Sequence, residues 1–140
     1  MNNKSLLGRN IIISGASQGL GEYCAIQMSK KGANIALISR NEENLNRVLN
    51  LCDTSNNNIV VPTDITNSID CANKIDEVIS HFNGKIDSVI HSVGGGLGYR
   101  DPLIDFDDFI KLFSTNLAGQ SLINKLVIPI MRNNCNGNIV

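Results

Sequence analysis

Short apolar runs alternate with amphipathic stretches along the chain, and this alternation predicts strands and helices in turn. Uninterrupted apolar runs are typical of strands buried on both faces, whereas apolar residues three or four positions apart indicate helices with one inward face. Strands are therefore predicted at 10–14, 34–39, 58–61, 86–91 and, as a beginning only, 137–140. Helices are predicted from 20 to 31, from 41 to 52, over 67–82 and over 105–132, the last with a bend near Gly119.

Individual residues indicate where these helices end and which faces they bury. Gly32 is expected to end the first helix, Asn41 to cap the second, and Asn83-Gly84 to end the third. The expected inward positions are Leu20, Cys24, Ala25 and Met28, then Leu45, Val48, Leu49 and Cys52, then Ala72, Ile75, Ile79 and Phe82. Strands that alternate with helices predict βαβ units, and hence a doubly wound, Rossmann-like parallel α/β sheet in one domain over 1–140.

Composition narrows the class of protein. The 140 residues are 42% hydrophobic with a formal net charge of −1, which gives no electrostatic basis for binding nucleic acid or an anionic membrane. The apolar runs are too short to span a bilayer. Four widely spaced cysteines favour buried, reduced thiols over disulfides or a metal site. We therefore expect a cytoplasmic, soluble protein without a metal, and we interpret its frequent, scattered asparagines as compositional bias.

The segment Ser14–Gly21, SGASQGLG, carries the strongest chemical signal. It follows the apolar run Ile11–Ile13 and opens the first predicted helix. A helix start presents free backbone amides and the positive end of its dipole to an anion. Glycines allow the backbone to approach a pyrophosphate closely. The segment therefore predicts a dinucleotide phosphate cradle, with an ordinary glycine-rich turn as the alternative.

The end of the second strand bears on the choice of nucleotide. In doubly wound sheets, ligands bind at the carboxyl ends of the strands. An acidic residue there would favour NAD through the ribose 2′-hydroxyl, but this chain has Ser39-Arg40-Asn41. The Arg40 guanidinium can fork onto a 2′-phosphate, which favours NADP(H) over NAD(H). A solvated arginine beside a helix N-terminus is the alternative.

Further candidates follow the later strands. Asp64, after the third strand, is expected either to accept a hydrogen bond from an adenine amine or to act as a turn aspartate. Gly94, after the fourth strand, would let a flat ring lie against the backbone, and we interpret His91 as a structural hydrogen-bonding residue. In the rim 94–103, Tyr99 and Arg100 are available to touch a ligand, with a solvated Arg100 favoured.

Together these segments resemble the short-chain dehydrogenase/reductase family over essentially the whole chain. Ser14–Gly21 is similar to the family's T-G-x-x-x-G-x-G turn, with serine for threonine, and Asp64-Ile65 to its adenine-contacting pair. His91–Gly94 aligns with the N-N-A-G segment but keeps only the glycine. Asn116, with Gly119, matches the active-site asparagine in its N-x-x-G context, and Pro102-Leu103 matches a substrate-side pair.

The resemblance implies hydride transfer between a nicotinamide and a small carbonyl or alcohol substrate, for example of the 3-oxoacyl type. In the family a tyrosine and a lysine four residues later, a serine and an asparagine form the active site, and the physical requirements are a proton donor and oxyanion stabilisation. Asn116 is the expected catalytic residue here. The expected cofactor-binding residues are Gly15, Ser17, Gln18, Gly19, Leu20, Gly21, Ser39, Arg40, Asn41, Asp64, Ile65, Ser92, Val93 and Gly94.

The chain departs from the family in having no Tyr-x-x-x-Lys. Tyr23 is followed four residues later by Gln27, and Tyr99 by Leu103. We therefore expect a truncated chain that holds the cofactor-binding half of a homo-oligomeric reductase and is inactive alone. A finished, non-catalytic nucleotide-binding or partner-binding module is the alternative. Isothermal titration with NADPH cannot separate the two hypotheses, because both predict binding.

Truncation would also leave apolar surface without cover. The expected strand order is 3-2-1-4 with the beginning of a fifth strand. Leu122, Leu126 and Ile130 form a second stripe on the long helix, and we expect that stripe to be exposed. An exposed stripe beside a bare sheet edge invites association, so the chain alone is expected to be poorly soluble or partly molten.

Overall fold

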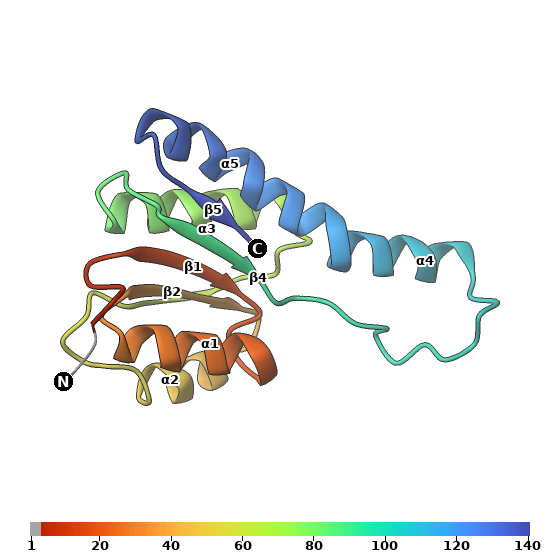
Figure 1. The fold of residues 1–140 in the computed structure, drawn as a ribbon. Helices are drawn as coiled ribbons and strands as arrows, with labels where there is room; N and C mark the ends of the chain where they lie inside the picture. Colours follow the sequence, from red (N-terminus) through yellow and green to blue (C-terminus); the bar gives the residue numbers. More distant parts are fainter. Residues whose placement is uncertain (1–3) are drawn as a thin grey trace.

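The computed structural model describes residues 4–140 and contains one parallel sheet with helices on both faces (Figure 1). The strand order is β3-β2-β1-β4-β5, which confirms the predicted doubly wound, Rossmann-like arrangement. Helices α1 and α2 cover one face of the sheet, and α3 and α5 cover the other. The elements are β1 (Asn10–Ser14), α1 (Gly19–Lys30), β2 (Asn34–Ser39), α2 (Glu42–Leu49), β3 (Ile59–Pro62), α3 (Ser68–His81), β4 (Ser88–His91), α4 (Phe106–Phe113), α5 (Gly119–Asn133) and β5 (Asn138–Ile139).

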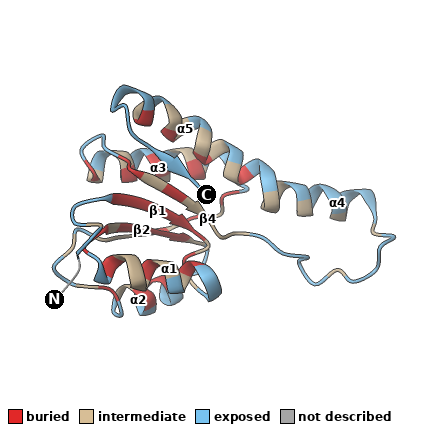
Figure 2. Cartoon of the chain, in the orientation of Figure 1, coloured by how far each residue is buried: buried red, intermediate tan, exposed pale blue. Residues whose placement is uncertain are grey.

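The central strand β1 explains why its sequence is apolar throughout. Side chains alternate between the two faces of a strand, and both faces of this sheet are covered. Ile12 packs in the core between the sheet and α3 and α5, whereas Ile11 and Ile13 pack in the core toward α1 and α2. Figure 2 shows buried residues concentrated in the strands and on the helix faces turned toward them. Each face of the strand thus contributes to a separate apolar layer.

The predicted inward faces need two corrections. Leu20 is 68% exposed, because it lies in the first turn of α1 beyond the carboxyl end of the sheet rather than under it. On α3 the fully buried residues include Cys71 and Val78, whereas the predicted Ala72 and Ile79 are half-buried. Because Ile75 and Phe82 are buried as predicted and Ile79 packs against the same core, the inward face of α3 is the predicted face extended on the side of Cys71 and Val78.

Most predicted helix ends agree with the structure, although α2 ends at Leu49, three residues before the predicted end at 52. Asn41 and Asn67 are the N-caps of α2 and α3, and each side-chain oxygen accepts a hydrogen bond from the amide three residues later. Gly32 adopts a left-handed φ of +93° just after α1, as a C-terminal glycine does. Strand β4 begins at Ser88 rather than at Ile86, because the Asp87 side chain and amide bond the start of β1 instead of extending the ladder.

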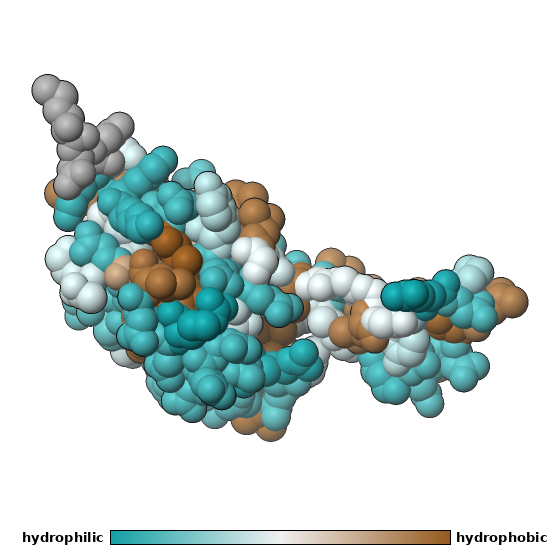
Figure 3. Space-filling view, turned by 90° about the horizontal axis from the view of Figure 1, so that it is seen from below, coloured by the Kyte–Doolittle hydropathy of each residue, from teal (hydrophilic) through white to brown (hydrophobic). Residues whose placement is uncertain are grey.

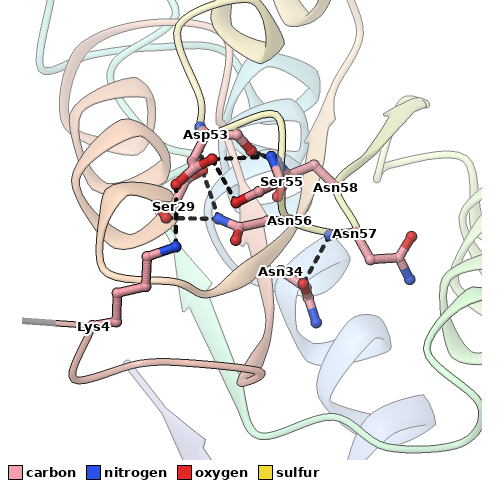
Figure 4. A network of polar contacts seen from close by, with 8 residues as sticks. All are labelled: Lys4, Ser29, Asn34, Asp53, Ser55, Asn56, Asn57 and Asn58. Carbon is pink, nitrogen blue, oxygen red and sulfur yellow. Dashed lines mark hydrogen bonds and ion pairs between the residues drawn. The ribbon is translucent and has the colours of Figure 1, made fainter. Parts of the chain in front are cut away.

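Asparagines stabilise the connections at the amino end of the sheet, so their frequency is more than compositional bias. The Asn34 carboxamide oxygen accepts from the Asn57 amide at 2.8 Å, and the Asn58 oxygen accepts from the Ile35 amide at 2.9 Å. Asn56 donates to the Ser29 carbonyl at 2.7 Å. Figure 4 shows this cluster joined by Asp53, which accepts from Ser55 and pairs with Lys4. The loop between α2 and β3 is therefore fixed by short polar side chains.

The long helical region predicted over 105–132 is divided in the structure. α4 is followed by a π-helical turn, Ser114–Ala118, and then by α5, which begins at Gly119. Figure 1 shows α4 and the preceding loop extending away from the sheet as an arm, defined here as residues 94–118. None of the residues of α4 is buried. The division falls where a bend was expected.

The expected exposed stripe on α5 is wrong. Leu122, Leu126 and Ile130 are half-buried and pack against the core beside Ile123 and Val127. Exposed apolar side chains lie instead along the arm, where Figure 3 shows hydrophobic atoms among hydrophilic ones. They are Leu97, Leu103, Phe106, Phe109, Ile110, Phe113 and Leu117.

The four cysteines are free, but only some of them are buried as we expected. Cys52 and Cys71 are buried, Cys24 is half-buried and Cys135 is exposed. Burial, reinforced by the negative charges of Asp70 and Asp64, raises the pKa of the Cys71 thiol to about 11. The buried thiols therefore behave as small apolar side chains of the core.

Candidate functional site

A cavity of about 650 Å³ lies at the carboxyl ends of β1, β2, β3 and β4. Every predicted cofactor-binding residue except Gly21 lines this cavity, so segments far apart in the sequence meet at one edge of the sheet. The lining is Gly15, Ser17, Gln18, Gly19, Leu20, Ile38, Ser39, Arg40, Asn41, Asn44, Thr63, Asp64, Ile65, Thr66, Ser92, Val93, Gly94, Leu97, Lys111 and Thr115. The location is the one where doubly wound sheets bind ligands.

The glycine turn is shaped by close backbone contacts. Gly15 has φ +76°, and a Cβ added there would lie 2.7 Å from the carbonyl carbon of Ser92. Its amide donates to the Ile38 carbonyl at 2.8 Å, so the turn is held between β2 and the end of β4. Gly21 lies behind the turn, where an added Cβ would be 2.2 Å from the Gly15 carbonyl oxygen. Gly21 therefore allows α1 to pack against the turn without lining the cavity itself.

Helix α1 begins at the cavity with an uncapped N-terminus. Gln18 is the N-cap residue, and its side chain makes no capping hydrogen bond. The first amides of a helix lack intrahelical partners and carry the positive end of the dipole. This helix start can therefore bind an anionic group in the cavity.

Ser39 is the last residue of β2 and Arg40 follows it, and both line the same cavity as the glycine turn. Within residues 4–140, the Ser39 hydroxyl is the buried side-chain oxygen that has no hydrogen-bond partner. A buried hydroxyl without a partner is costly, so Ser39 is suited to hydrogen-bond a ligand. Arg40 is exposed at the cavity rim. The two residues together offer a hydroxyl and a cation to a phosphate.

Asp64 is held in a turn while it faces the cavity. Its carboxylate accepts from the Thr66 amide at 2.9 Å and from the Thr66 hydroxyl at 2.7 Å. Burial raises the pKa of Asp64, but the Thr66 hydrogen bonds and the positive charge of Arg40 together lower it below its ordinary value. Asp64 therefore acts as a turn aspartate, which is one of the two roles expected for it. Its contact with adenine stays a prediction.

His91 makes hydrogen bonds on both sides of its ring. Its Nδ1 lies 3.2 Å from the Ser14 hydroxyl, and its Nε2 lies 2.8 Å from the Asn124 side-chain oxygen. The tautomer with its proton on Nε2 satisfies both contacts, since it donates to Asn124 and accepts from Ser14. His91 thus joins β1, β4 and α5, which confirms its predicted hydrogen-bonding role.

Asn116 lies in the π-helical turn and does not line the cavity. Its side chain bonds Gly95, and its oxygen would lie 3.1 Å from a Cβ added at Gly94. Three residues later, a Cβ at Gly119 would lie 2.7 Å from Ile65, so this glycine lets the helix approach the loop after β3. Asn116, the predicted catalytic residue, therefore stabilises the rim of the cavity without lining the cavity itself.

The arm contributes cavity residues that sequence reasoning missed. Lys111 and Thr115 line the cavity one helical turn apart, and Thr115 directly precedes Asn116. No local sequence signal singles out either residue, because the direction of the arm places them at the cavity. Asn44 follows the predicted residue Asn41 by about one helical turn and could have been found from it. Tyr99, expected to touch a ligand, instead donates to Asp108 at 2.7 Å, and Arg100 is exposed.

Residues 4–140 contain no group of three or more His, Cys, Asp or Glu side chains placed to hold a metal ion. Over the same residues, no helix combines the length and the apolar character needed to cross a membrane.

Known proteins resemble the chain in both sequence and fold. An 11-beta-hydroxysteroid dehydrogenase-like 2 protein of Arabidopsis thaliana is 33% identical over 92% of this chain and 42% of its own length. A tropinone reductase homolog from the same plant is 30% identical over 97% of this chain and 52% of its own length. The chain thus spans about half, or less, of the length of these relatives.

Solved structures share the fold over nearly the whole chain. A 7 alpha-hydroxysteroid dehydrogenase, solved with NADH and 7-oxo glycochenodeoxycholic acid, superposes with a TM-score of 0.87 at 28% identity, over 99% of this chain and 54% of that one. A hydroxysteroid dehydrogenase from Escherichia coli superposes with a TM-score of 0.86 at 28% identity, over 99% and 58% of the two chains. A family model described as short chain dehydrogenase matches residues 9–140. The chain belongs to the short-chain dehydrogenase/reductase family of oxidoreductases.

Proposed function

We propose that this chain is the cofactor-binding domain of an NADP(H)-dependent oxidoreductase. The observation that carries the proposal is that one cavity gathers the glycine turn, Ser39-Arg40-Asn41 and Asp64 at one edge of the sheet. Its volume of about 650 Å³ lies within the range of about 300–1,000 Å³ that is typical of small-molecule sites. When bound, the nicotinamide supplies or accepts the hydride, and the residues of this chain bind and orient the dinucleotide.

The residues present fit such a cofactor. The uncapped start of α1 at Gln18 suits the pyrophosphate. Asp64 is expected to accept from the adenine amine, since hydrogen bonding and Arg40 keep its carboxylate ionised. Ser92, Val93 and Gly94 provide a backbone rim against which a flat ring can lie. The buried hydroxyl of Ser39 would gain the partner that it lacks among the described residues.

The preference for NADP(H) rests on Arg40. A guanidinium at the end of β2 can bind a 2′-phosphate through two charge-assisted hydrogen bonds, and no acidic residue occupies position 39 or 40. The 7 alpha-hydroxysteroid dehydrogenase named above was solved with NADH, so the preference is proposed for this chain on its own residues. The Ser39 hydroxyl beside Arg40 supports it as a second phosphate ligand.

The proposed substrate is a small molecule with a carbonyl or alcohol group, for example of the 3-oxoacyl or hydroxysteroid type. The names of relatives support this class: hydroxysteroid dehydrogenases, and a 3-ketoacyl-(acyl-carrier-protein) reductase of Brucella melitensis with a TM-score of 0.81 at 26% identity. Since these 140 residues contain no Tyr-x-x-x-Lys, we expect them to bind the cofactor without turning substrate over.

Two properties of the whole protein are proposed from features outside the cavity. Homo-oligomerisation is supported by the apolar side chains exposed along the arm, Phe106, Phe109 and Phe113 among them. A cytoplasmic location is supported by the four free cysteines, which suit a reducing compartment.

Isothermal titration of the chain with NADPH and NADH tests the proposal. Wild type is expected to bind both and to prefer NADPH. The substitution Arg40→Asp should weaken NADPH binding by about 10- to 150-fold, the equivalent of a charge-assisted hydrogen bond, and leave NADH binding unchanged or stronger. Arg100→Asp, in the exposed arm, is the matched control and should change neither. Equal losses for both nucleotides would reject the assignment of Arg40, and no binding of either would reject the proposal itself.

A further inference from the structure

Arg47 of α2 joins three elements beside the cofactor cavity. Its Nη1 donates to Glu22 Oε1 at 2.8 Å, and its Nη2 donates to Glu22 Oε2 at 2.8 Å. Nη2 also donates to the Ser17 carbonyl at 3.1 Å. One guanidinium therefore connects α2, the first turn of α1 and the glycine turn, although Arg47 itself does not line the cavity. The two parallel bonds to Glu22 fix the orientation of the guanidinium plane.

The bond to Ser17 determines how the glycine turn presents its amides. In a trans peptide the carbonyl and the following N–H point in opposite directions. Because Arg47 holds the Ser17 carbonyl toward α2, the amide of Gln18 points the opposite way. Ser17 and Gln18 both line the cavity, and Gln18 is the N-cap of α1. Arg47 thus fixes the orientation of the Ser17–Gln18 peptide, and with it the direction of the Gln18 amide, at a segment that lines the cavity.

The bonds to Glu22 neutralise a charge that would oppose the cofactor. Glu22 follows the cavity-lining segment Gln18–Leu20 by about half a turn, and its own amide donates to the Gln18 carbonyl at 3.3 Å. Hydrogen bonding from Arg47 lowers the pKa of Glu22, so the carboxylate is ionised at neutral pH. An ionised carboxylate near a pyrophosphate is repulsive unless a cation is paired with it.

We propose that Arg47 is a positioning residue of the cofactor site, which orients the Ser17–Gln18 peptide and neutralises Glu22 without touching the cofactor. The inference rests on the proposed function, because it concerns the pyrophosphate part of the same cavity. It separates the roles of two arginines: Arg40 acts at the 2′-phosphate, and Arg47 acts through the turn on the pyrophosphate. Binding of a nucleotide that lacks the pyrophosphate should therefore not depend on Arg47.

The test compares NADPH with adenosine 2′-monophosphate, which keeps the adenine and the 2′-phosphate only, by isothermal titration of the whole chain. Arg47→Ala should weaken NADPH binding about tenfold and change adenosine 2′-monophosphate binding by less than about twofold. Arg47→Lys keeps the charge but not the fork, and should lose part of the NADPH affinity. Lys74→Ala on α3 removes a cation from a comparable pair with Glu77 and should change neither affinity.

A double-mutant cycle separates the electrostatic contribution from a merely structural one. Glu22→Gln combined with Arg47→Ala should bind NADPH several-fold more tightly than Arg47→Ala alone, since the unpaired carboxylate has been removed. Equal loss of both ligands in Arg47→Ala and Arg47→Lys, or no loss of either, would overturn the inference while NADPH binding by wild type still supports the proposed function. If wild type binds neither NADPH nor NADH, the proposed function fails, and the inference fails with it.

Discussion

Asn116 and Gly95 exchange two hydrogen bonds across the rim of the cavity. The Gly95 amide donates to Asn116 Oδ1 at 2.9 Å, and Asn116 Nδ2 donates to the Gly95 carbonyl at 3.0 Å. One carboxamide thus satisfies both backbone groups of a glycine whose φ of +129° lies outside the strand and helix regions. The π-helical turn 114–118 that carries Asn116 is a rare geometry that is frequent at functional sites.

Asn116→Asp should open this rim locally. Aspartate can still accept from the Gly95 amide, but it cannot donate to the Gly95 carbonyl and places a carboxylate oxygen against it. The loss of one hydrogen bond, about 1 kcal/mol, should raise the amide exchange rate at 94–96 roughly fivefold. Hydrogen exchange followed by mass spectrometry measures this change. Asn73→Asp, at an exposed position of α3, should leave the rim unaffected, and unchanged exchange in Asn116→Asp would refute the role given to Asn116.

Two glycines of the same turn should respond differently to alanine. At Gly21 a new Cβ would lie 2.2 Å from the Gly15 carbonyl oxygen, so either the turn or α1 must shift. Gly19 has φ +58° but nothing within 4 Å of an added Cβ, so Gly19→Ala meets backbone strain alone. Gly21→Ala should lower the free energy of unfolding by about 3 kcal/mol, and Gly19→Ala by about 1 kcal/mol. Urea denaturation measures both, and a smaller loss in Gly21→Ala than in Gly19→Ala would contradict the packing described.

The sheet and most helix ends could be predicted because each rests on a local signal. Asn41 and Asn67 cap helices through their own side chains, and the apolar run of β1 reports that both faces of the sheet are covered. The position of Leu20 could not be predicted, because it depends on where α1 starts relative to the sheet edge. The burial of Leu126 likewise depends on how closely α5 packs against α3.

The site residues that directly follow a strand were predictable, whereas those that reach the cavity from the arm were not. Gly15, Arg40 and Asp64 each follow a strand, so the topology alone brings them together. Lys111 reaches the cavity from the arm, whose direction is set by the loop 94–105 and by the π-helical turn rather than by any local sequence signal. The bonds of Arg47 to Ser17 and Glu22 cross 30 and 25 residues and carry no periodic pattern.

The cysteines provide a test of core packing in solution. In a brief treatment of the native chain with iodoacetamide at pH 8, Cys135 should react at least about tenfold faster than Cys71, whose pKa of about 11 and burial both suppress the thiolate. Burial also raises the pKa of Cys52, so Cys52 should be protected as well. Peptide mass spectrometry gives each extent of alkylation, and a urea-unfolded sample is the control in which all four should react. Similar rates in the native chain would indicate the partly molten state.

Asp87 anchors the amino end of the sheet and should make stability depend on acid. Its buried carboxylate accepts from the Arg9 guanidinium at 2.8 Å, from the Asn10 amide at 2.9 Å and from the Asn136 carboxamide at 2.8 Å. Burial raises the pKa of Asp87, but the hydrogen bonds from Asn10 and Arg9 and the charges of Lys85 and Arg9 together lower it below its ordinary value. The folded chain therefore favours the ionised form more than the unfolded chain does.

The sign of the pH dependence follows from that lowered pKa. The contribution of Asp87 to the free energy of unfolding is complete above the ordinary aspartate pKa of about 3.9 and is lost as the pH falls through the lower, folded value. Asp87→Asn should cost about 1.5–3 kcal/mol at pH 7, and its difference from wild type should shrink steadily below about pH 4. Urea titrations from pH 7 to pH 3 measure that difference, with Asp76→Asn, exposed on α3, as the control. If this difference in the free energy of unfolding stayed constant over the range, the packing of the Asp87 side chain, and not its charge, would stabilise the fold.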